Sequence, residues 1–374
     1  MFVRTVTLKN YRNIGEAEVS FSPGVNLILG NNAQGKTNLI EAIYLFARGR
    51  SFRATPDRDL CRSGESFFSV KNEYTDRDRE QELFVEYSEK KMKRFVNGVK
   101  VDRNIEMLSR FRAVLFCPDH LEIVKGAPAE RREFLNIAIS QLSRDYIYLL
   151  GNYGIALDHR NAVLKGLGAP GMTGGERNRR AELLAVWDRQ LAKYAAKIAA
   201  MRAFYVKSLS PFAEFAMSEM SGGGETLRLT YDCDIEDPED AAEGEKKYEK
   251  LFSESWERDI LTGATQHGVH RDDLVFRLNG EYLRLMGSQG QQRTAVLSLK
   301  LAEGEICREK TGEYPVFLLD DVFSELDAGR RDYLRRRSEG KQFLITSCEE
   351  DLRADCGERV IRAERGVFTP LGDA

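Results

Sequence analysis

Alternating and continuous apolar runs open the chain. Apolar and polar positions alternate over 3–8 and 16–21, and 25–29 is apolar apart from Asn26. A period of two is typical of a half-buried strand, and a nearly continuous apolar run is typical of a strand buried on both faces. The pattern therefore predicts three short strands before residue 30, followed by a helix over 38–47.

Further strands are predicted between this helix and residue 116. Their ranges are 67–74, 82–87, 93–96 and 99–101. Asn97-Gly98 is a strong hairpin signal because both residues tolerate the positive φ that a two-residue turn requires. These strands should form an antiparallel sheet.

The middle of the chain has a helical period. Apolar positions recur every three or four residues over 135–164 and again over 184–205, with a glycine-rich break at 166–171. This spacing predicts a helical hairpin, and arms of about 30–38 residues would be ~45–57 Å long at 1.5 Å per residue. Two core helices of a compact domain are the alternative. The acidic stretch 232–259 is expected to be a solvated linker.

An α/β pattern returns after residue 260. The expected elements are strands at 274–278, 316–319 and 342–346, a helix at 290–308 and a strand pair ending near 368. The fold class is therefore α/β. Residues 1–120 and 261–374 should form one domain, and 121–260 should be inserted in it as a helical arm.

Length and charge narrow the class of protein. The chain has 374 residues, enough for two or three domains, and a net charge of −3, so no overall basic character indicates nucleic acid. Its six cysteines show no Cys-x-x-Cys pair, and no apolar stretch approaches the length of a membrane span. No secretory signal opens the chain. We expect a cytoplasmic protein with reduced thiols.

A complete phosphate-binding loop, G-x-x-x-x-G-K-[ST], follows the third predicted strand. Its residues are Gly30, Asn31, Asn32, Ala33, Gln34, Gly35, Lys36 and Thr37, with Asn38 next in the helix. Between a strand and a helix, such glycines let backbone N–H groups surround phosphate oxygens, and the helix start adds a positive dipole end. We expect Lys36 to reach the terminal phosphates and Thr37 to bind Mg²⁺.

Two carboxylates follow the strand predicted at 316–319. Asp320 suits the residue that holds Mg²⁺, and Asp321 suits the residue that polarises the attacking water. A buried strand whose trailing carboxylates simply begin a turn is the alternative. Because the two parts of the site are far apart in sequence, a large segment must be inserted within one nucleotide-binding fold.

A third element precedes the helix predicted at 290–308. The turn is made of Ser288, Gln289, Gly290 and Gln291. Such a helix start presents N–H donors to an anion, although taken alone it is most simply an N-cap. Its separation from Asp320 is that between the signature motif and the Walker B strand of ATP-binding-cassette heads. Ser324 and Asp327 then stand where those heads carry their D-loop.

The chain resembles the RecF family of bacterial recombination mediators, whose ATPase head is of the SMC type. The resemblance covers the whole length and rests on six motifs in order, at 10–13, 30–38, 116–119, 270–274, 288–293 and 318–327. It implies an ABC/SMC-type P-loop ATPase head with an inserted helical arm. Arg12 and the phosphate loop would bind ATP, and the Ser288 turn of a second copy would cap the terminal phosphate. Asp327 would couple the two sites.

The resemblance also implies a function. An ATP-driven homodimer would bind DNA at gaps and at junctions of single strand and duplex, in recombinational repair, replication-fork maintenance and the SOS response. With RecR- and RecO-type mediators it would help load the recombinase. Hydrolysis should be slow and act as a switch, because Asp321 stands where related heads carry a longer glutamate. An SMC-like DNA-organising ATPase is the alternative. A transporter subunit is less favoured, because Cys348 stands where transporters carry a switch histidine.

Two arginine clusters are candidate DNA contacts. They comprise Arg48, Arg50, Arg53, Arg58 and Arg62, and Arg330, Arg331, Arg335, Arg336 and Arg337. Arginine suits bidentate phosphate contacts, and no sequence-reading motif accompanies these clusters, so recognition of the duplex backbone is expected. Solvated helix faces with local salt bridges are the alternative.

Overall fold

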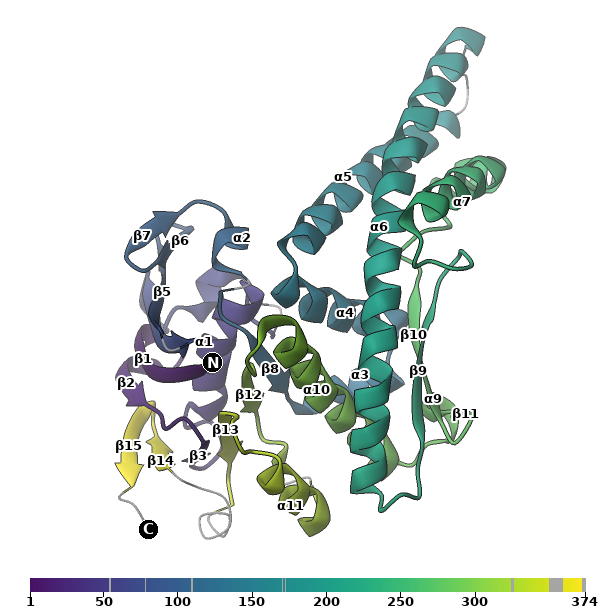
Figure 1. The fold of residues 1–374 in the computed structure, drawn as a ribbon. Helices are drawn as coiled ribbons and strands as arrows, with labels where there is room; N and C mark the ends of the chain where they lie inside the picture. The colour runs from purple at the N-terminus through teal and green to yellow at the C-terminus, as the bar shows by residue number, and fades with distance from the viewer. Residues whose placement is uncertain are drawn as a thin grey trace. The chain divides into compact units, whose positions relative to one another are not determined.

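The chain folds into two compact units built from interleaved segments. The computed structural model describes residues 1–53, 55–77, 79–108, 110–169, 171, 173–323, 326–349 and 359–371. The first unit comprises Met1–Leu121, Phe215–Glu225 and Arg293–Ala374, and the second comprises Glu122–Glu214 and Thr226–Gln292. Figure 1 shows the elements of both.

A mostly parallel six-stranded sheet holds the core of the first unit. Its order is β15 (Val367–Leu371), β14 (Arg359–Glu364), β3 (Val25–Leu29), β13 (Phe343–Ser347), β12 (Val316–Leu319) and β8 (Ala113–Phe116). Only the β14–β15 pair is antiparallel. Strands β3, β8, β12 and β13 are buried along their whole length, as expected of parallel strands covered on both faces. The predicted α/β class and the predicted strands of this sheet are confirmed.

An antiparallel sheet completes the strands of the first unit. Its order is β2 (Ile14–Ser20), β1 (Phe2–Tyr11), β4 (Phe68–Asp76), β5 (Arg79–Ser88), β6 (Lys91–Val96) and β7 (Val99–Val101). Asn97 and Gly98 have φ values of 49° and 76°, so the predicted hairpin turn is confirmed. Short elements nearby are η1 (Asp57–Leu60), α2 (Asn104–Met107) and η2 (Pro118–Leu121).

The helices of the first unit flank the phosphate loop and the last strands. Helix α1 (Lys36–Arg48) buries nearly all of its apolar residues and ends at Gly49, whose N–H donates to the Leu45 carbonyl at 2.8 Å. Helix α11 is Ala328–Arg336, and α10 (Gln289–Thr311) starts in the second unit and continues in the first. The predicted helices at 38–47 and 290–308 are confirmed.

The second unit consists mainly of helices. They are α3 (Glu122–Lys125), α4 (Pro128–Leu142), α5 (Arg144–Leu167), most of α6 (Gly174–Met220), α7 (Ala241–Glu254), α8 (Trp256–Thr262) and α9 (Leu283–Met286). A three-stranded antiparallel sheet, ordered β11 (Glu281–Tyr282), β10 (Asp273–Leu278) and β9 (Leu227–Asp232), accompanies them.

The predicted helical hairpin exists, but its arms differ from the prediction. Leu164 and Leu167 of α5 pack in one cluster with Leu184 of α6. The first arm is not one continuous helix, because α4 ends at Leu142 and α5 begins at Arg144. The Ser143 hydroxyl between them accepts a hydrogen bond from the Tyr146 N–H and caps the start of α5. The second arm is longer than predicted: α6 has 47 residues, or ~70 Å at 1.5 Å per residue.

The acidic stretch before residue 260 is not a solvated linker. It contains α7 and α8, and Tyr248 and Phe252 of α7 are buried. One reason why this stretch packs against the unit is Arg160 of α5, whose side chain is 0% exposed and needs acidic partners. Its guanidinium binds Asp188 at 2.6 Å and Asp259 of α8 at 2.7 Å, so these acids neutralise a buried cation.

The division into units differs from the predicted domains in where the chain returns to the first unit. The first border lies at Leu121, next to the predicted one, but the chain returns to the first unit briefly at Phe215–Glu225 and then from Arg293, rather than at residue 261. Pairing explains the difference, because β10 forms an antiparallel ladder with β9 that keeps both strands in the second unit.

Candidate nucleotide-binding site

The phosphate loop connects β3 to α1 through backbone conformations that favour glycine. Gly35 has φ 110° and Ala33 has φ 63°. A Cβ on Gly30 would lie 2.3 Å from the Ala363 carbonyl oxygen of β14, so no side chain fits there. The turn between β14 and β15 braces the loop: the N–H groups of Arg365 and Gly366 donate to the Gln34 side-chain and backbone oxygens at 2.6 and 2.9 Å.

A cavity of about 420 Å³ lies over this loop. Its lining comprises Asn13, Asn32, Ala33, Gln34, Gly35, Lys36, Thr37, Asn38, Arg53 and Asp321. The Lys36 ammonium donates to the carbonyl oxygens of Gly30 and, at 3.0 Å, of Asn31, and lies 3.4 Å from the Cys348 sulfur. Eight predicted residues therefore meet Asn13 and Arg53 in one cavity whose volume falls in the ligand-site range of roughly 300–1,000 Å³.

The strand order brings the two distant halves of the site together. Strand β13 lies between β3 and β12, and the carboxyl ends of these parallel strands meet at one edge. The Thr37 hydroxyl donates to Asp320 Oδ1 at 3.0 Å across 283 positions of sequence. A threonine hydroxyl beside a carboxylate offers two oxygen ligands of the kind that Mg²⁺ takes.

Thr346 of β13 organises both carboxylates, and the sequence analysis missed it. Its hydroxyl donates to Asp320 Oδ1 at 2.9 Å and accepts from the Asp321 N–H at 2.9 Å. Burial raises the pKa of Asp320, and the hydrogen bonds from Thr346 and Thr37 oppose that rise. Asp321 has φ 55°, a left-handed conformation that the Thr346 contact helps to hold. The only sequence signal was a threonine near the end of a predicted buried strand.

A buried carboxylate on α1 holds two arginines beside the cavity. Glu41 is 0% exposed and accepts from Arg12 Nε and Nη2 at 2.9 and 2.7 Å, and from the Ser51 hydroxyl at 2.6 Å. Arg12 therefore contacts Glu41 and does not line the cavity. Arg53, predicted as a DNA contact, lines the cavity and donates to the Asn38 side chain at 3.0 Å.

The Ser288 turn begins α10 in the second unit. The Ser288 N–H donates to the Gln291 side chain at 2.8 Å, and the Gln291 N–H donates to the Ser288 hydroxyl at 3.2 Å. This reciprocal capping box fixes the helix start. Ser288 and Gln289 are exposed, and Gly290 and Gln291 are half-buried, so the turn lies at the surface of its own unit.

Asp327 of the predicted D-loop caps α11. Its carboxylate accepts from the Arg330 N–H at 2.9 Å and from the Arg330 guanidinium at 2.6 Å. The cap remains largely exposed. Ser324 lies outside the described residues.

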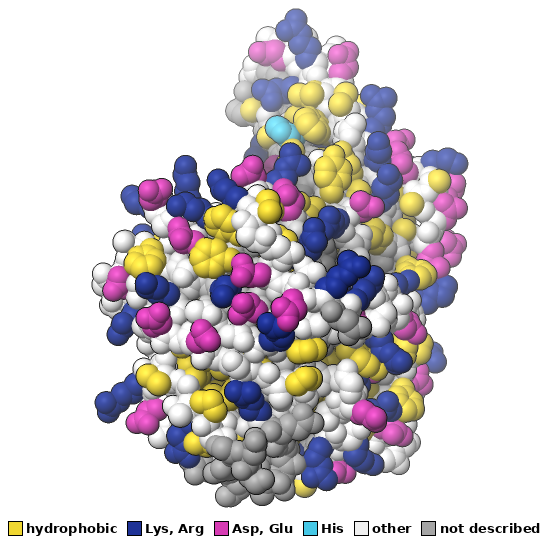
Figure 2. All heavy atoms as spheres, turned by 60° about the vertical axis from the view of Figure 1, so that its left-hand side comes forward, with side chains coloured by type: hydrophobic (Ala, Val, Ile, Leu, Met, Phe, Trp, Pro, Cys, Tyr) yellow, Lys and Arg dark blue, Asp and Glu magenta, His cyan; other side chains and the backbone are white. Residues whose placement is uncertain are grey.

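Local acids pair with most of the second predicted arginine cluster and with part of the first. Arg58 pairs with Asp59, Arg335 and Arg336 pair with Asp332, Arg331 lies 3.6 Å from Glu349, and Arg48 donates to the Ser51 carbonyl. On the face drawn in Figure 2, Lys and Arg side chains are interspersed with Asp and Glu. These pairs are of the kind expected of solvated helix faces with local salt bridges, and DNA contact by the clusters stays a prediction.

A row of cations on α6 was not singled out from the sequence. Arg189, Lys193 and Lys197 are exposed on successive turns, and within the described part of the chain none has an ion-pair or side-chain hydrogen-bond partner. Residues four apart lie on one helix face. The sequence does show these cations at i, i+4 and i+8, but the apolar positions of the same segment were used to predict the helix and the cations were not considered.

Comparison with known proteins gives consistent matches over nearly the whole chain. Residues 2–367 match the family model of the RecF/RecN/SMC N-terminal domain. The chain is 38% identical to the DNA replication and repair protein RecF of Bacillus velezensis over 354 residues, covering 94% of each chain. It is 36% identical to RecF of a Thermoanaerobacter species over 360 residues, covering 95% of this chain and 97% of that one.

Solved structures agree with these matches. A structure of the recombination mediator protein RecF with ATP, in the RecFOR pathway, has a TM-score of 0.90 and 34% identity, covering 99% of this chain and 98% of that one. The Smc head domain of Pyrococcus furiosus has a TM-score of 0.57 at 18% identity, covering 99% and 96%, which shows the fold alone. No helix among the described residues is long and apolar enough to cross a membrane.

Proposed function

The chain belongs to the RecF/RecN/SMC family, and on this premise we propose that it is a RecF-like ATPase of DNA replication and repair, which ATP joins into a dimer on DNA in the cytoplasm. One observation carries the proposal. The phosphate loop and the carboxylate that completes its site lie within one hydrogen bond, Thr37 to Asp320, in a fold that superposes on ATP-bound RecF with a TM-score of 0.90.

The residues of the cavity suit a triphosphate. The loop N–H groups and the Lys36 ammonium would bind the phosphates, and Arg53 would add a second cation from the cavity wall. Thr37 and Asp320 would hold Mg²⁺, which supplies charge neutralisation when bound. Asp321 would orient water, and its short side chain favours the slow turnover of a switch.

The exposed Ser288 turn would act on a second copy of the chain. Its N–H donors and the helix dipole of α10 suit the terminal phosphate held by the partner's loop. Two such contacts form an isologous pair that buries two nucleotides. Asp327 and Ser324 would lie at the same interface, so loss of the terminal phosphate would loosen the dimer.

The basic row on α6 supports binding to the DNA backbone. Its three cations, which have no ion-pair partner in the described part of the chain, span ~12 Å of the helix at 1.5 Å per residue, and duplex DNA presents a charge about every 1.7 Å of its axis. Arg48, Arg50, Arg330 and Arg335 remain proposed contacts beside it. RecR- and RecO-type mediators would be the protein partners at gapped DNA.

The alternatives are not favoured by the comparisons. SMC heads share the fold at 16–18% identity, well below the 34–38% identity to RecF proteins. A transporter subunit would need a γ-phosphate contact from the position of Cys348, and that side chain is bonded to Asn32 instead.

Sedimentation with ATP, ADP or no nucleotide, each with and without a gapped duplex, tests the proposal. ATP alone should double the mass, and Ser288→Arg should abolish this dimer while nucleotide binding persists. Ser253→Arg, at an exposed site on α7, is the matched control and should dimerise normally. A wild-type protein that stays monomeric with ATP and DNA would refute the dimer.

A further inference from the structure

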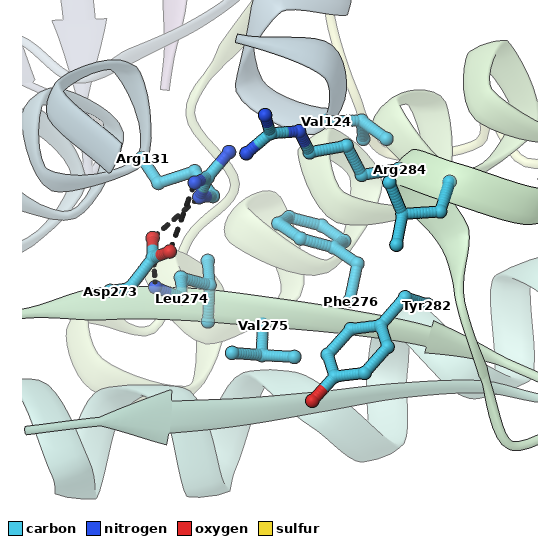
Figure 3. A pocket seen from close by; sticks show the side chains of 9 residues that line it. Val124, Arg131, Asp273, Leu274, Val275, Phe276, Tyr282 and Arg284 are labelled. Carbon is cyan, nitrogen blue, oxygen red and sulfur yellow. Dashed lines mark hydrogen bonds and ion pairs between the residues drawn. The ribbon is translucent and has the colours of Figure 1, made fainter. Parts of the chain in front are cut away.

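The second unit contains a cavity of about 350 Å³ that the nucleotide site does not use. Its lining combines apolar side chains from three elements, Val124 of α3, Phe276 of β10 and Leu285 of α9, with two arginines. Figure 3 shows Val124, Phe276 and both arginines. Its volume lies at the lower end of the range for ligand sites, roughly 300–1,000 Å³. A small apolar group fits such a space.

One arginine of the cavity is already neutralised. Arg131 of α4 is 4% exposed and binds both oxygens of Asp273, at 2.5 and 2.9 Å. It also donates to the Gly126 carbonyl at 2.9 Å. The Leu274 N–H donates to Asp273 Oδ1 at 2.8 Å, so this carboxylate already accepts three hydrogen bonds.

The other arginine has no such partner. Arg284 of α9 is exposed, and no ion pair or hydrogen bond involves its side chain within the described residues. In Figure 3 its guanidinium and that of Arg131 point toward one another. Asp273 neutralises Arg131 but not Arg284, so the rim of the cavity carries a positive charge that none of the described residues pairs with.

The apolar wall beside Arg284 is held in place and uncovered. The Arg277 guanidinium lies 4.0 Å from the centre of the Tyr282 ring, a cation–π contact that fixes this wall. Leu285 and Met286 are 73% and 72% exposed. Large apolar side chains gathered at the edge of a cavity are typical of a binding surface.

We propose that this cavity binds an acidic segment of a partner protein, with an apolar side chain in the cavity and a neighbouring carboxylate on Arg284. A carboxylate fits the planar guanidinium with two parallel hydrogen bonds. The apolar lining and one cation without an ion-pair partner among the described residues favour a peptide over a nucleic acid, whose affinity depends on many phosphate contacts. We expect binding without nucleotide because this cavity shares no lining residue with the nucleotide cavity, and the proposal rests on the proposed function only in taking the partner to be a repair protein.

Fluorescence anisotropy with labelled peptides tests the site in the full chain without ATP. The probe is Gly-Ser-Asp-Leu-Asp-Phe, and its controls carry Asn for both Asp, or Ala for Leu and Phe. The acidic apolar probe should bind, and both controls should bind at least tenfold more weakly. Arg284→Glu should weaken the probe at least tenfold and regain affinity for a peptide with Lys in place of Asp. Arg258→Glu, an exposed site on α8, should bind the probe like the wild type.

Several outcomes would overturn the proposal. The proposal fails if the wild type does not bind the probe up to about 1 mM, or if all three peptides bind equally well. It also fails if Arg258→Glu loses as much affinity for the probe as Arg284→Glu. Loss of the ATP dimer in Arg284→Glu, with no peptide bound by the wild type, would assign the cavity to a second copy of the chain. A wild type that binds peptide but never dimerises with ATP would leave this site intact and refute the proposed function instead.

Discussion

Replacing Thr346 with valine should disable hydrolysis while largely preserving ATP binding. Valine keeps the shape of threonine but removes the hydroxyl that donates to Asp320 and accepts from the Asp321 N–H. Thr346 is 0% exposed, so water cannot replace either bond. The change therefore acts on both carboxylates of the site without altering the phosphate loop.

The contacts set the size of the effect. A hydrogen bond to a charged group contributes about 1.5–3 kcal/mol, and a buried N–H left without an acceptor costs about 1–3 kcal/mol. Because Asp320 retains its bond from Thr37, we expect the free energy of unfolding to fall by about 3 kcal/mol. Misplacement of Asp321 should lower kcat at least tenfold, which needs only about 1.4 kcal/mol in the barrier.

The pH dependence gives a second readout. The Thr346 bond lowers the pKa of Asp320 against the rise caused by burial, so the valine variant should have a higher pKa at this carboxyl. Protonated Asp320 cannot hold a cation, and the acid limb of the kcat/KM profile should therefore move toward neutral pH. Because the folded pKa lies above the unfolded one, the stability lost in the variant should grow as pH rises through this window.

ATPase rates between pH 5 and 8, urea unfolding and nucleotide binding measure these effects, and Thr346→Ser is the matched control. Serine keeps the hydroxyl and should retain most of the activity and the wild-type acid limb. If the valine variant hydrolysed ATP at the wild-type rate, or if its acid limb did not move, Thr346 would not position the carboxylates.

Two further predictions concern nucleotide access and DNA. Alkylation of the exposed Cys348 by N-ethylmaleimide should block ATP binding, because the Cys348 sulfur lies 3.4 Å from the Lys36 ammonium. Bound ATP should protect Cys348 from alkylation, and the Cys348→Ser variant should keep its ATP binding after treatment. A fully alkylated protein that still binds ATP would count against this geometry. Replacing Arg189, Lys193 and Lys197 together with Gln should reduce the slope of log affinity for duplex DNA against log salt by about 2.7 if each contacts one phosphate. The same triple change at Lys246, Lys247 and Lys250 of α7, which are already bonded to neighbours, should leave that slope unchanged, and an equal loss there would indicate a general charge effect.

The parts of the site that depend on short stretches of sequence could be predicted, and those that depend on strand order could not. The loop at 30–37 and the strand before Asp320 each carry their own local pattern. Thr346 acquires its role only because β13 lies between β3 and β12, which no local window reveals. In the sequence, Arg53 is one of several similar arginines. In the structure, its contacts with Glu41 and Asn38 hold it at the cavity.

The helical unit shows the same limit. A buried cation such as Arg160 breaks the apolar repeat, and its partners at Asp188 and Asp259 lie on other helices. Without knowledge of its partner Arg160, Asp259 is one more acid in the acidic stretch 232–259, and that composition indicates a solvated linker. The spacing of Tyr248 and Phe252, four residues apart, was a helical signal that the overall charge obscured.

The brace between Gln34 and the turn at Arg365 and Gly366 has a consequence for biogenesis. The phosphate loop leaves the ribosome early in translation, but the residues that hold its site, at positions 320, 346 and 366, are synthesised hundreds of positions later. A nascent chain thus carries a recognisable nucleotide motif without a working pocket. ATP can therefore stabilise the loop only after the segments that carry Asp320, Thr346 and Gly366 have been synthesised.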